Sequence, residues 1–281
     1  MRRLIVCADD FGLDPAVNSA VEEACRHGIL STASLMVGAP AATDAVVRAR
    51  RLAGLHVGLH LVLVDGCPVS PSPAVAGLVG ADGRFEPNMA RAGLRFFCLP
   101  EIRRQLAREI RAQFEAFAAT GLALDHVNTH KHMHLHPTVA ALILAIGRDY
   151  GMKAMRVPAE PVAALRAAFP QERARPPLYR PWVERLRRRL RHAGLAVNDH
   201  VFGLAWSGRM VEKRVLRLLP NLPGGVSEIY FHPATERSPA LAALMPEYHH
   251  TEELAALTSE AVKAQIAALD IRFANYGMLC R

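Results

Sequence analysis

Residues 3–12 read RLIVCADDFG, an apolar run that ends in two adjacent aspartates and a glycine. The apolar residues 3–8 predict a buried strand, because the run is short and stops at two aspartates. A helix is expected directly afterwards, with Asp14 as its N-cap, Pro15 as its first residue and Gly28 at its end. A buried strand followed at once by a helix is the unit from which parallel α/β sheets are built.

The same strand–helix unit recurs along the chain, with helical patterns over 41–53, 101–120 and 137–150. No sequence repeat or low-complexity tract divides the chain, so we expect one domain over 1–281. Up to eight alternating strands predict an α/β fold, a (β/α) barrel or a distorted relative of one. Two long insertions are expected, at 65–99 and 159–199. The later candidate strands are 32–37, 56–64, 124–129, 153–157, 200–205, 226–231 and 271–276.

The composition is that of an ordinary globular protein. Of the 281 residues, 51% are hydrophobic and 21% are charged, which excludes disordered, collagen-like and coiled-coil chains. The apolar runs are too short for a membrane span, and we expect neither a span nor a signal peptide. The five cysteines form no C-x-x-C pair, which argues against a disulfide framework and a cysteine zinc site and favours a reducing cytoplasm.

The net charge of +8 predicts attraction to anionic surfaces such as nucleic acid or the inner leaflet of a membrane. Much of this excess is local, with eight arginines between positions 173 and 191. Residues 182–193 predict a basic amphipathic helix, and two interpretations stay open. Arg185–Arg191 could make a peripheral contact with an anionic membrane, or the helix could pack on the barrel with a solvated basic face. The expected apolar face comprises Val183, Leu186, Leu190 and Ala193.

Titratable side chains occur where the expected strands end. Taken singly, an aspartate there is usually a turn or cap residue, and a histidine is usually a hydrogen-bonded core residue. A barrel brings the carboxyl ends of its strands to one mouth, where a carboxylate and two imidazoles could occupy three positions on a metal. This pattern favours a hydrolytic metal site. The side chains are Asp9 and Asp10, His60, His130, Arg156 and His232.

The adjacent carboxylates Asp9 and Asp10 suit two different tasks. Alternating side chains of an extended strand point apart, so one could bind a metal while the other takes a proton from the attacking water. Arg156 at the same rim could keep the second aspartate ionised, or it could form only a surface ion pair.

Residues 125–137 hold five of the 13 histidines. If the segment is extended, alternation puts His130, His132 and His134 on one side, so we expect one metal ligand with the others as its partners. The alternative is a polar loop in which the histidines have no common role.

Four motifs occur in order along the chain: ADDFG (8–12), GLH (58–60), NTHKHMH (128–134) and FHP (231–233). They resemble the YdjC-like carbohydrate deacetylases, which hydrolyse N-acetyl groups from amino sugars. The resemblance covers nearly the whole chain and looks closest to a branch associated with hopanoid biosynthesis, whose members deacetylate an N-acetylglucosaminyl hopanoid lipid. The narrower resemblance depends on VGLHLVLV (57–64), RAGLRFF (91–97) and DHVN (125–128).

The resemblance implies a metal-dependent amide hydrolysis. Asp9 would act as general base and His232 as general acid, and Arg156 would steady the base. Relatives often carry an aspartate where this chain has Asn128, so the hydrogen-bond partner of the implied ligand His130 stays open. The ligand set suits zinc or magnesium, with cobalt, nickel and manganese as alternatives. The implied metal ligands are Asp10, His60 and His130.

Four further residues are candidates for substrate binding. The apolar run 94–99 could meet a hydrophobic aglycone or simply belong to the core. Two other functions stay open: a soluble chitooligosaccharide (diacetylchitobiose) deacetylase, and a basic nucleic-acid-binding protein, although the charge does not explain the metal rim. A homodimer and a peripheral position at the inner membrane face are also left open. The candidate substrate-binding residues are His132, His134, Phe96 and Phe97.

Overall fold

The structure is a computed structural model that describes residues 1–172, 174 and 176–280. Arg173 and Arg175 of the basic segment therefore lie outside the described residues. The strands form one parallel sheet in the order β4-β3-β2-β1-β6-β5, and β7 pairs with the first half of β1. The strands are β1 (Arg2–Phe11), β2 (Thr32–Leu35), β3 (His56–Leu61), β4 (Val127–Thr129), β5 (His200–Phe202), β6 (Gly225–Phe231) and β7 (Arg272–Phe273).

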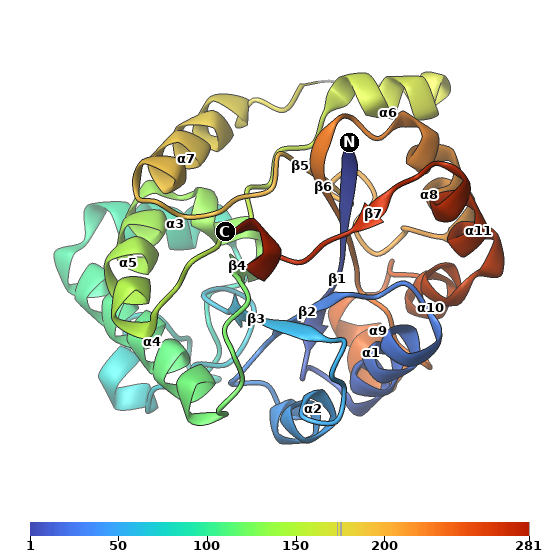
Figure 1. Ribbon diagram of the computed structural model, residues 1–281. Helices are drawn as coiled ribbons and strands as arrows, with labels where there is room; N and C mark the ends of the chain where they lie inside the picture. The colour runs from blue at the N-terminus through green and yellow to red at the C-terminus, as the bar shows by residue number, and fades with distance from the viewer. Residues whose placement is uncertain (173, 175, 281) are drawn as a thin grey trace.

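The sheet is curled into a half-barrel, and helices surround it (Figure 1). The predicted strand at 153–157 is reduced to isolated bridges, one from Met155 to β4 and one from Ala154 to Ala196. Beyond these bridges the side chain of Asn198 pairs with the backbone of Val157, where a neighbouring strand would otherwise do so. Its amide accepts from Val157 N at 2.7 Å and donates to Val157 O at 2.8 Å. The barrel predicted from eight strands is thus a distorted one, with an irregular side between β4 and β5.

The first helix, α1 (Pro15–His27), confirms the expected signals: Asp14 caps it by accepting from Ala16 N at 2.8 Å. The two long stretches contain helices, α3 and η1 in the first, α6, η4 and α7 in the second. The apolar run 94–99 therefore lies mostly on a helix. Among the described residues no helix is long and apolar enough to cross a bilayer. The other α-helices are α2 (Ala42–Ala49), α3 (Met89–Cys98), α4 (Pro100–Ala119), α5 (Pro137–Gly147), α6 (Val162–Ala168), α7 (Arg180–His192), α8 (Glu212–Leu218), α9 (Pro239–Leu244), α10 (His250–Thr258) and α11 (Glu260–Ala268).

Short 3₁₀ helices complete the chain. Of these, η2 matters most for the site because it follows β4 directly. They are η1 (Ser72–Val75), η2 (His130–Leu135), η3 (Arg148–Tyr150), η4 (Pro170–Glu172), η5 (Leu219–Asn221) and η6 (Gly277–Leu279).

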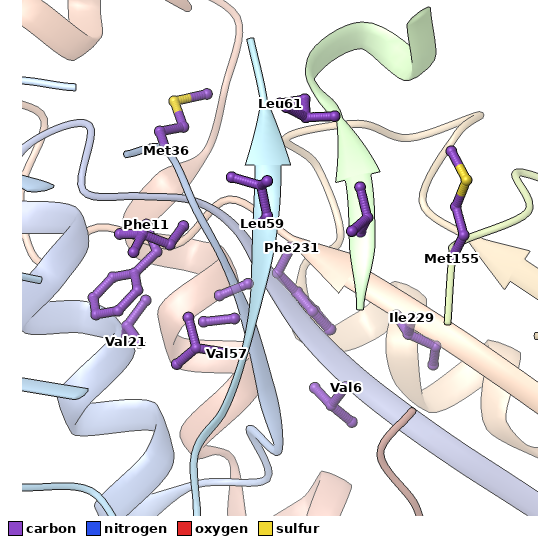
Figure 2. Packing of buried hydrophobic residues seen from close by; sticks show 14 of the residues in the cluster. Val6, Phe11, Val21, Met36, Val57, Leu59, Leu61, Met155, Ile229 and Phe231 are labelled. Carbon is purple, nitrogen blue, oxygen red and sulfur yellow. The ribbon is translucent and has the colours of Figure 1, made fainter. Parts of the chain in front are cut away.

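The two faces of the sheet have different surroundings, because strand side chains alternate. Val6 of β1, Leu59 of β3 and Phe231 of β6 belong to the large core shared with the helices, which Figure 2 shows from close by. The alternate residue Cys7 belongs to a separate small cluster with Tyr230. The curled inner face is therefore narrow, and it carries most of the polar side chains described below.

Gly58 of β3 shows how tightly the inner face is packed. A Cβ at this position would lie 2.4 Å from the ring of His126. That ring is buried, stacks on Tyr276 with centroids 4.6 Å apart, and bonds Ser34 at 3.0 Å. His126 is thus a hydrogen-bonded core histidine, and a glycine is required beneath it.

Candidate metal centre and active site

The two aspartates at the end of β1 point to different partners. The backbone of Asp10 is left-handed, with φ 61°, and the register of β1 against β2 shifts between Ala8 and Phe11. Aspartate tolerates this conformation better than most residues do. The divergence expected from strand alternation is therefore present, but a left-handed residue helps to produce it.

Asp10, His60 and His130 form a triad in which Asp10 and His60 are buried and His130 is partly exposed. Asp10 Oδ1 lies 3.3 Å from His60 Nε2 and 3.3 Å from His130 Nδ1. The three candidate ligand atoms lie within 4.8 Å of one another. A group of one carboxylate and two imidazoles at this spacing is the donor set expected for a divalent cation with open positions.

The buried polar atoms of the triad fit a metal. Both carboxylate oxygens of Asp10 and Nε2 of His60 have no hydrogen-bond partner among the described residues, although each is fully buried. Leaving such atoms unpaired is costly, because they have given up their bonds to water. A cation between them would satisfy all of these atoms at once.

Asn128 orients one of the ligands. Its Oδ1 lies 2.7 Å from His60 Nδ1, so His60 carries its proton there when Nε2 faces a cation. The amide nitrogen of Asn128 donates to Asp9 Oδ1 at 3.1 Å and to Ser34 Oγ at 2.9 Å. Asn128 therefore links the candidate ligand His60 to Asp9. The side chain that replaces the relatives' aspartate thus bonds His60 and Asp9, and not His130.

Asp9 is held by a buried charge network. Arg156 donates from Nη1 to Asp9 Oδ2 at 2.6 Å and from Nη2 to Asp9 Oδ1 at 2.9 Å. Burial alone would raise the pKa of Asp9, but the charges of Arg156, His60 and His232 and the hydrogen bonds from Arg156 together outweigh it and hold that pKa well below its usual range. Arg156 is fully buried, so the alternative of a surface ion pair is wrong.

The same arginine binds a second carboxylate, Glu228 of β6. Arg156 Nη2 lies 2.6 Å and Nε 3.0 Å from Glu228 Oε1. Tyr276 donates to the other oxygen of Glu228 at 2.6 Å. Arg156 therefore lies between two buried acids, which fixes its orientation and moderates the positive field acting on Asp9.

His232 lies at the end of β6 with its ring in the cavity. Its backbone N–H donates to Glu253 at 2.5 Å, and its carbonyl lies 2.7 Å from His250 Nδ1. The rings of Tyr230 and Tyr248 flank it, with centroids 5.6 and 4.9 Å away. Burial lowers the pKa of His232, so the imidazole is neutral until the reaction supplies a proton.

The histidine-rich segment does not continue as a strand. β4 ends at Thr129, and residues 130–135 turn into a 3₁₀ helix in which Lys131 and His132 are left-handed. The expected alternation of His130, His132 and His134 on one side of an extended segment is therefore wrong.

Each of the later histidines has its own surroundings. His132 lies 3.3 Å from the Tyr230 hydroxyl and lines the cavity. His134 is buried and lies 2.8 Å from the Thr129 hydroxyl, away from the cavity lining. Of these two candidate substrate-binding residues, the structure brings only His132 to the cavity.

A cavity of about 610 Å³ opens over the triad. Phe96 and Phe97 are not among its lining residues; both lie on α3, with ring centroids 6.2 and 6.3 Å from that of His136. The lining includes Asp9, His60 and His232, together with other polar residues such as Lys131 and Tyr248. It also includes many apolar residues: Leu13, Met36, Ala39, Pro40, Val62, Leu204, Ala240, Leu244, Met245 and Pro246.

Four residues of the site escaped sequence reasoning: Glu228, Tyr230, Tyr248 and Glu253. A signal existed for two of them, because Glu228 and Tyr230 precede His232 at steps of two along one strand and so share its face. Tyr248 and Glu253 come from the region of α10 and carry no comparable signal.

The chain is similar to several known proteins. A family model described as YdjC-like protein matches residues 3–268. A carbohydrate deacetylase of Geobacillus stearothermophilus is 29% identical over 277 residues, which cover 98% of this chain and 97% of that protein. A chitooligosaccharide deacetylase of Enterobacter sp. is 39% identical over 155 residues, 55% of this chain. That alignment, like the one with a carbohydrate deacetylase of Brevibacillus brevis (38% identical), spans little more than half of the relative, 58% and 56% respectively.

The fold also has a counterpart among solved structures. The crystal structure of a putative cellobiose-phosphate cleavage protein from Enterococcus faecalis superposes with a TM-score of 0.76. It covers 99% of this chain and 98% of the other, at 24% sequence identity. This likeness supports the curled parallel sheet as the shared fold.

Proposed function

Because the chain belongs to the YdjC-like protein family, we propose that it is a metal-dependent hydrolase that removes the N-acetyl group from an amino sugar. One observation carries this proposal: an Asp–His–His triad, in which buried ligand atoms of Asp10 and His60 are unpaired, lies next to an arginine-bound carboxylate. That combination provides a cation site and a base at one wall of a cavity, which is what amide hydrolysis by water needs.

Asp10, His60 and His130 would hold the cation, with zinc or magnesium expected first. When bound, a divalent cation supplies Lewis-acid polarisation of the acetamide and a lowered pKa for water. The chain's own contribution is to present these ligands in a buried pocket. Asn128 adds to this by keeping His60 in the tautomer that leaves Nε2 free.

Asp9 is the proposed general base. Arg156 donates to both of its oxygens and Asn128 donates to Oδ1 as well, so Oδ2 is the oxygen that keeps a lone-pair direction with which to take a proton from the attacking water. Glu228 shares the arginine, which keeps Arg156 from suppressing the basicity of Asp9 completely.

His232 is the proposed general acid. An amide nitrogen is a poor leaving group until it is protonated, so a proton must reach it as the C–N bond breaks. The attacking water supplies this proton: Asp9 takes it first, and it then passes to the amine nitrogen through His232, which gives it up readily because burial lowers its pKa. Over one cycle water adds across the amide, which gives acetate and the free amine.

For the substrate we propose the N-acetylglucosaminyl hopanoid lipid. The apolar residues in the cavity lining support an amino sugar that carries a hydrophobic aglycone, because such side chains would shield a lipid from water. The second candidate is a chitooligosaccharide such as diacetylchitobiose. The names of the relatives from Enterobacter and Serratia marcescens favour that substrate.

Mass spectrometry of two parallel reactions tests these proposals. N-acetylglucosaminyl hopanoid and diacetylchitobiose are each incubated with the enzyme, with and without a chelator. We expect loss of one acetyl group from the lipid, abolished by the chelator. Loss from the oligosaccharide alone would keep the deacetylase and reject the lipid, and chelator-resistant loss would reject the metal site.

A further inference from the structure

The start of α7 exposes three large apolar side chains. Leu178 is 95%, Trp182 53% and Tyr179 41% exposed to solvent. They lie in or next to the first turn of a helix at the outer edge of the molecule (Figure 1). A leucine and two aromatic residues clustered in this way are unusual on a surface that only water covers.

Arginines surround this apolar cluster. α7 contributes six arginines against one glutamate. Within the described part of the chain, no carboxylate lies at ion-pair distance from Arg180, Arg185, Arg188 or Arg189, whereas Arg187 and Arg191 are paired with Glu184 and Asp199. The positive charge near the first turns is therefore uncompensated.

The apolar stripe of α7 is not available for insertion into a membrane. Val183, Leu186 and Leu190 are buried against the rest of the protein. The expectation that the helix packs on the barrel is confirmed in this respect, and its basic face is fixed outwards. A membrane contact would have to use the first turn and the arginines without unpacking the helix.

The cluster lies toward the end of the barrel where the cavity opens, because α7 packs against η2, which follows β4 and lines the cavity with His130 and His132. Partial burial and the nearby carboxylate of Glu160 raise the pKa of Tyr179. Glu160 accepts from the backbone of Gly203 and Leu204 directly after β5, and Leu204 lines the cavity. The last turn of α7 reaches the opposite end, where Arg191 pairs with Asp199 before β5 begins.

We propose that the α7 surface, defined as Leu178–Arg180, Trp182, Arg185, Arg188 and Arg189, docks on an anionic lipid bilayer with the cavity mouth turned toward the membrane. Tryptophan, tyrosine and arginine suit the bilayer interface, since each joins an apolar body to a polar end. Arginines near an anionic leaflet add electrostatic attraction. The proposal concerns binding and stands whichever amino sugar the enzyme deacetylates.

Vesicle sedimentation tests it with the full-length protein and no substrate. Two variants probe the surface: Leu178→Ser with Trp182→Ala, and Arg185→Gln, Arg188→Gln with Arg189→Gln. Two matched controls change exposed residues elsewhere: Phe273→Ala, and Arg50→Gln, Arg51→Gln with Arg272→Gln. The vesicles are pure phosphatidylcholine or a mixture with phosphatidylglycerol.

We expect salt-sensitive binding to the phosphatidylglycerol vesicles, reduced at least about tenfold by each α7 variant and little changed by either control. Circular dichroism and hydrolysis of a soluble substrate should be unchanged in the α7 variants. Equal losses in the controls would mean that net charge alone binds the lipid, which would overturn the proposal. The proposal would also be overturned if the protein bound no vesicles, or bound nucleic acid in their place. A change of molecular mass in the apolar variant would identify an interface between two copies and would overturn it too.

Discussion

At the end of β1, two neighbouring carboxylates face different partners, and substitution should separate their roles. Asp10→Asn removes the charged ligand between His60 and His130, so we expect the metal and the activity to be lost together. Asp9→Asn leaves the triad intact and should keep the metal, with turnover reduced on the order of 10²–10⁴-fold. Metal content by mass spectrometry and acetate release would be measured on the same preparations.

A matched control for these variants is Asp149→Asn, at an exposed ion pair with Arg111 far along the chain. It should leave both metal content and turnover near the wild-type values. An Asp9→Asn protein without metal would show that Asp9 is a ligand and not a base.

Arg156 should matter for stability as well as for chemistry. Arg156→Met leaves Asp9 and Glu228 buried without their shared cation, and we expect this to cost about 3–5 kcal/mol of unfolding free energy. Urea denaturation would measure the loss. Arg111→Met, at a solvent-exposed pair, should change the midpoint little; an equally small effect at Arg156 would contradict the buried network.

At the scale of elements, β3 positions His60 at the site and has no room for a side chain at Gly58. Gly58→Ala would press a Cβ against the buried His126 ring, so we expect a loss of about 1–3 kcal/mol and a drop in activity as β3 shifts. Gly54→Ala, where the added Cβ meets nothing within 4 Å, is the control. Thermal unfolding of the pair would decide the matter, and equal midpoints would count against the packing argument.

The segment after β4 has a conformation that its sequence pattern does not predict. The expectation that His130, His132 and His134 share one side depended on an extended segment. The chain instead turns at Lys131 and His132, both left-handed, and the Thr129 hydroxyl meets His134. Such a turn is stabilised by contacts with Tyr230 and Asp65 from distant parts of the chain, so local pattern alone could not reveal it.

For the molecule as a whole, buried acids and histidines should give stability a maximum near neutral pH. Burial raises the pKa of Glu253 from 4.5 to about 8, so the folded state keeps a proton that the unfolded chain has released. That contribution is complete below pH 4.5 and is lost as the pH rises toward 8. Between pH 6.5 and 8.5 we expect a fall of about 2 kcal/mol in the unfolding free energy.

The acid side has the opposite sign. Burial lowers the pKa of His134 and of His250, so on acidification the unfolded chain binds protons that the folded state does not bind. Stability should therefore fall as the pH drops below the ordinary histidine value of 6.5. Urea denaturation across pH 5 to 8.5 would measure the fall of the unfolding free energy on the acid and on the alkaline side. Glu253→Gln should remove most of the fall on the alkaline side. A Glu253→Gln protein with an undiminished alkaline fall would assign that fall to other groups.

The resemblance to the YdjC-like family singled out the three metal ligands. The alternation of strands and helices, the carboxylates after β1 and the rim of titratable residues could be predicted from the sequence pattern, that is, from apolar runs, a capped helix and the residues at strand ends. The folded structure was needed to show that Arg156 is shared by Asp9 and Glu228, that Asn128 bonds His60, and that the side of the barrel at 153–157 is irregular. Each of these depends on which groups a curled sheet brings within hydrogen-bond distance from residues far apart in the chain, and no local pattern encodes that.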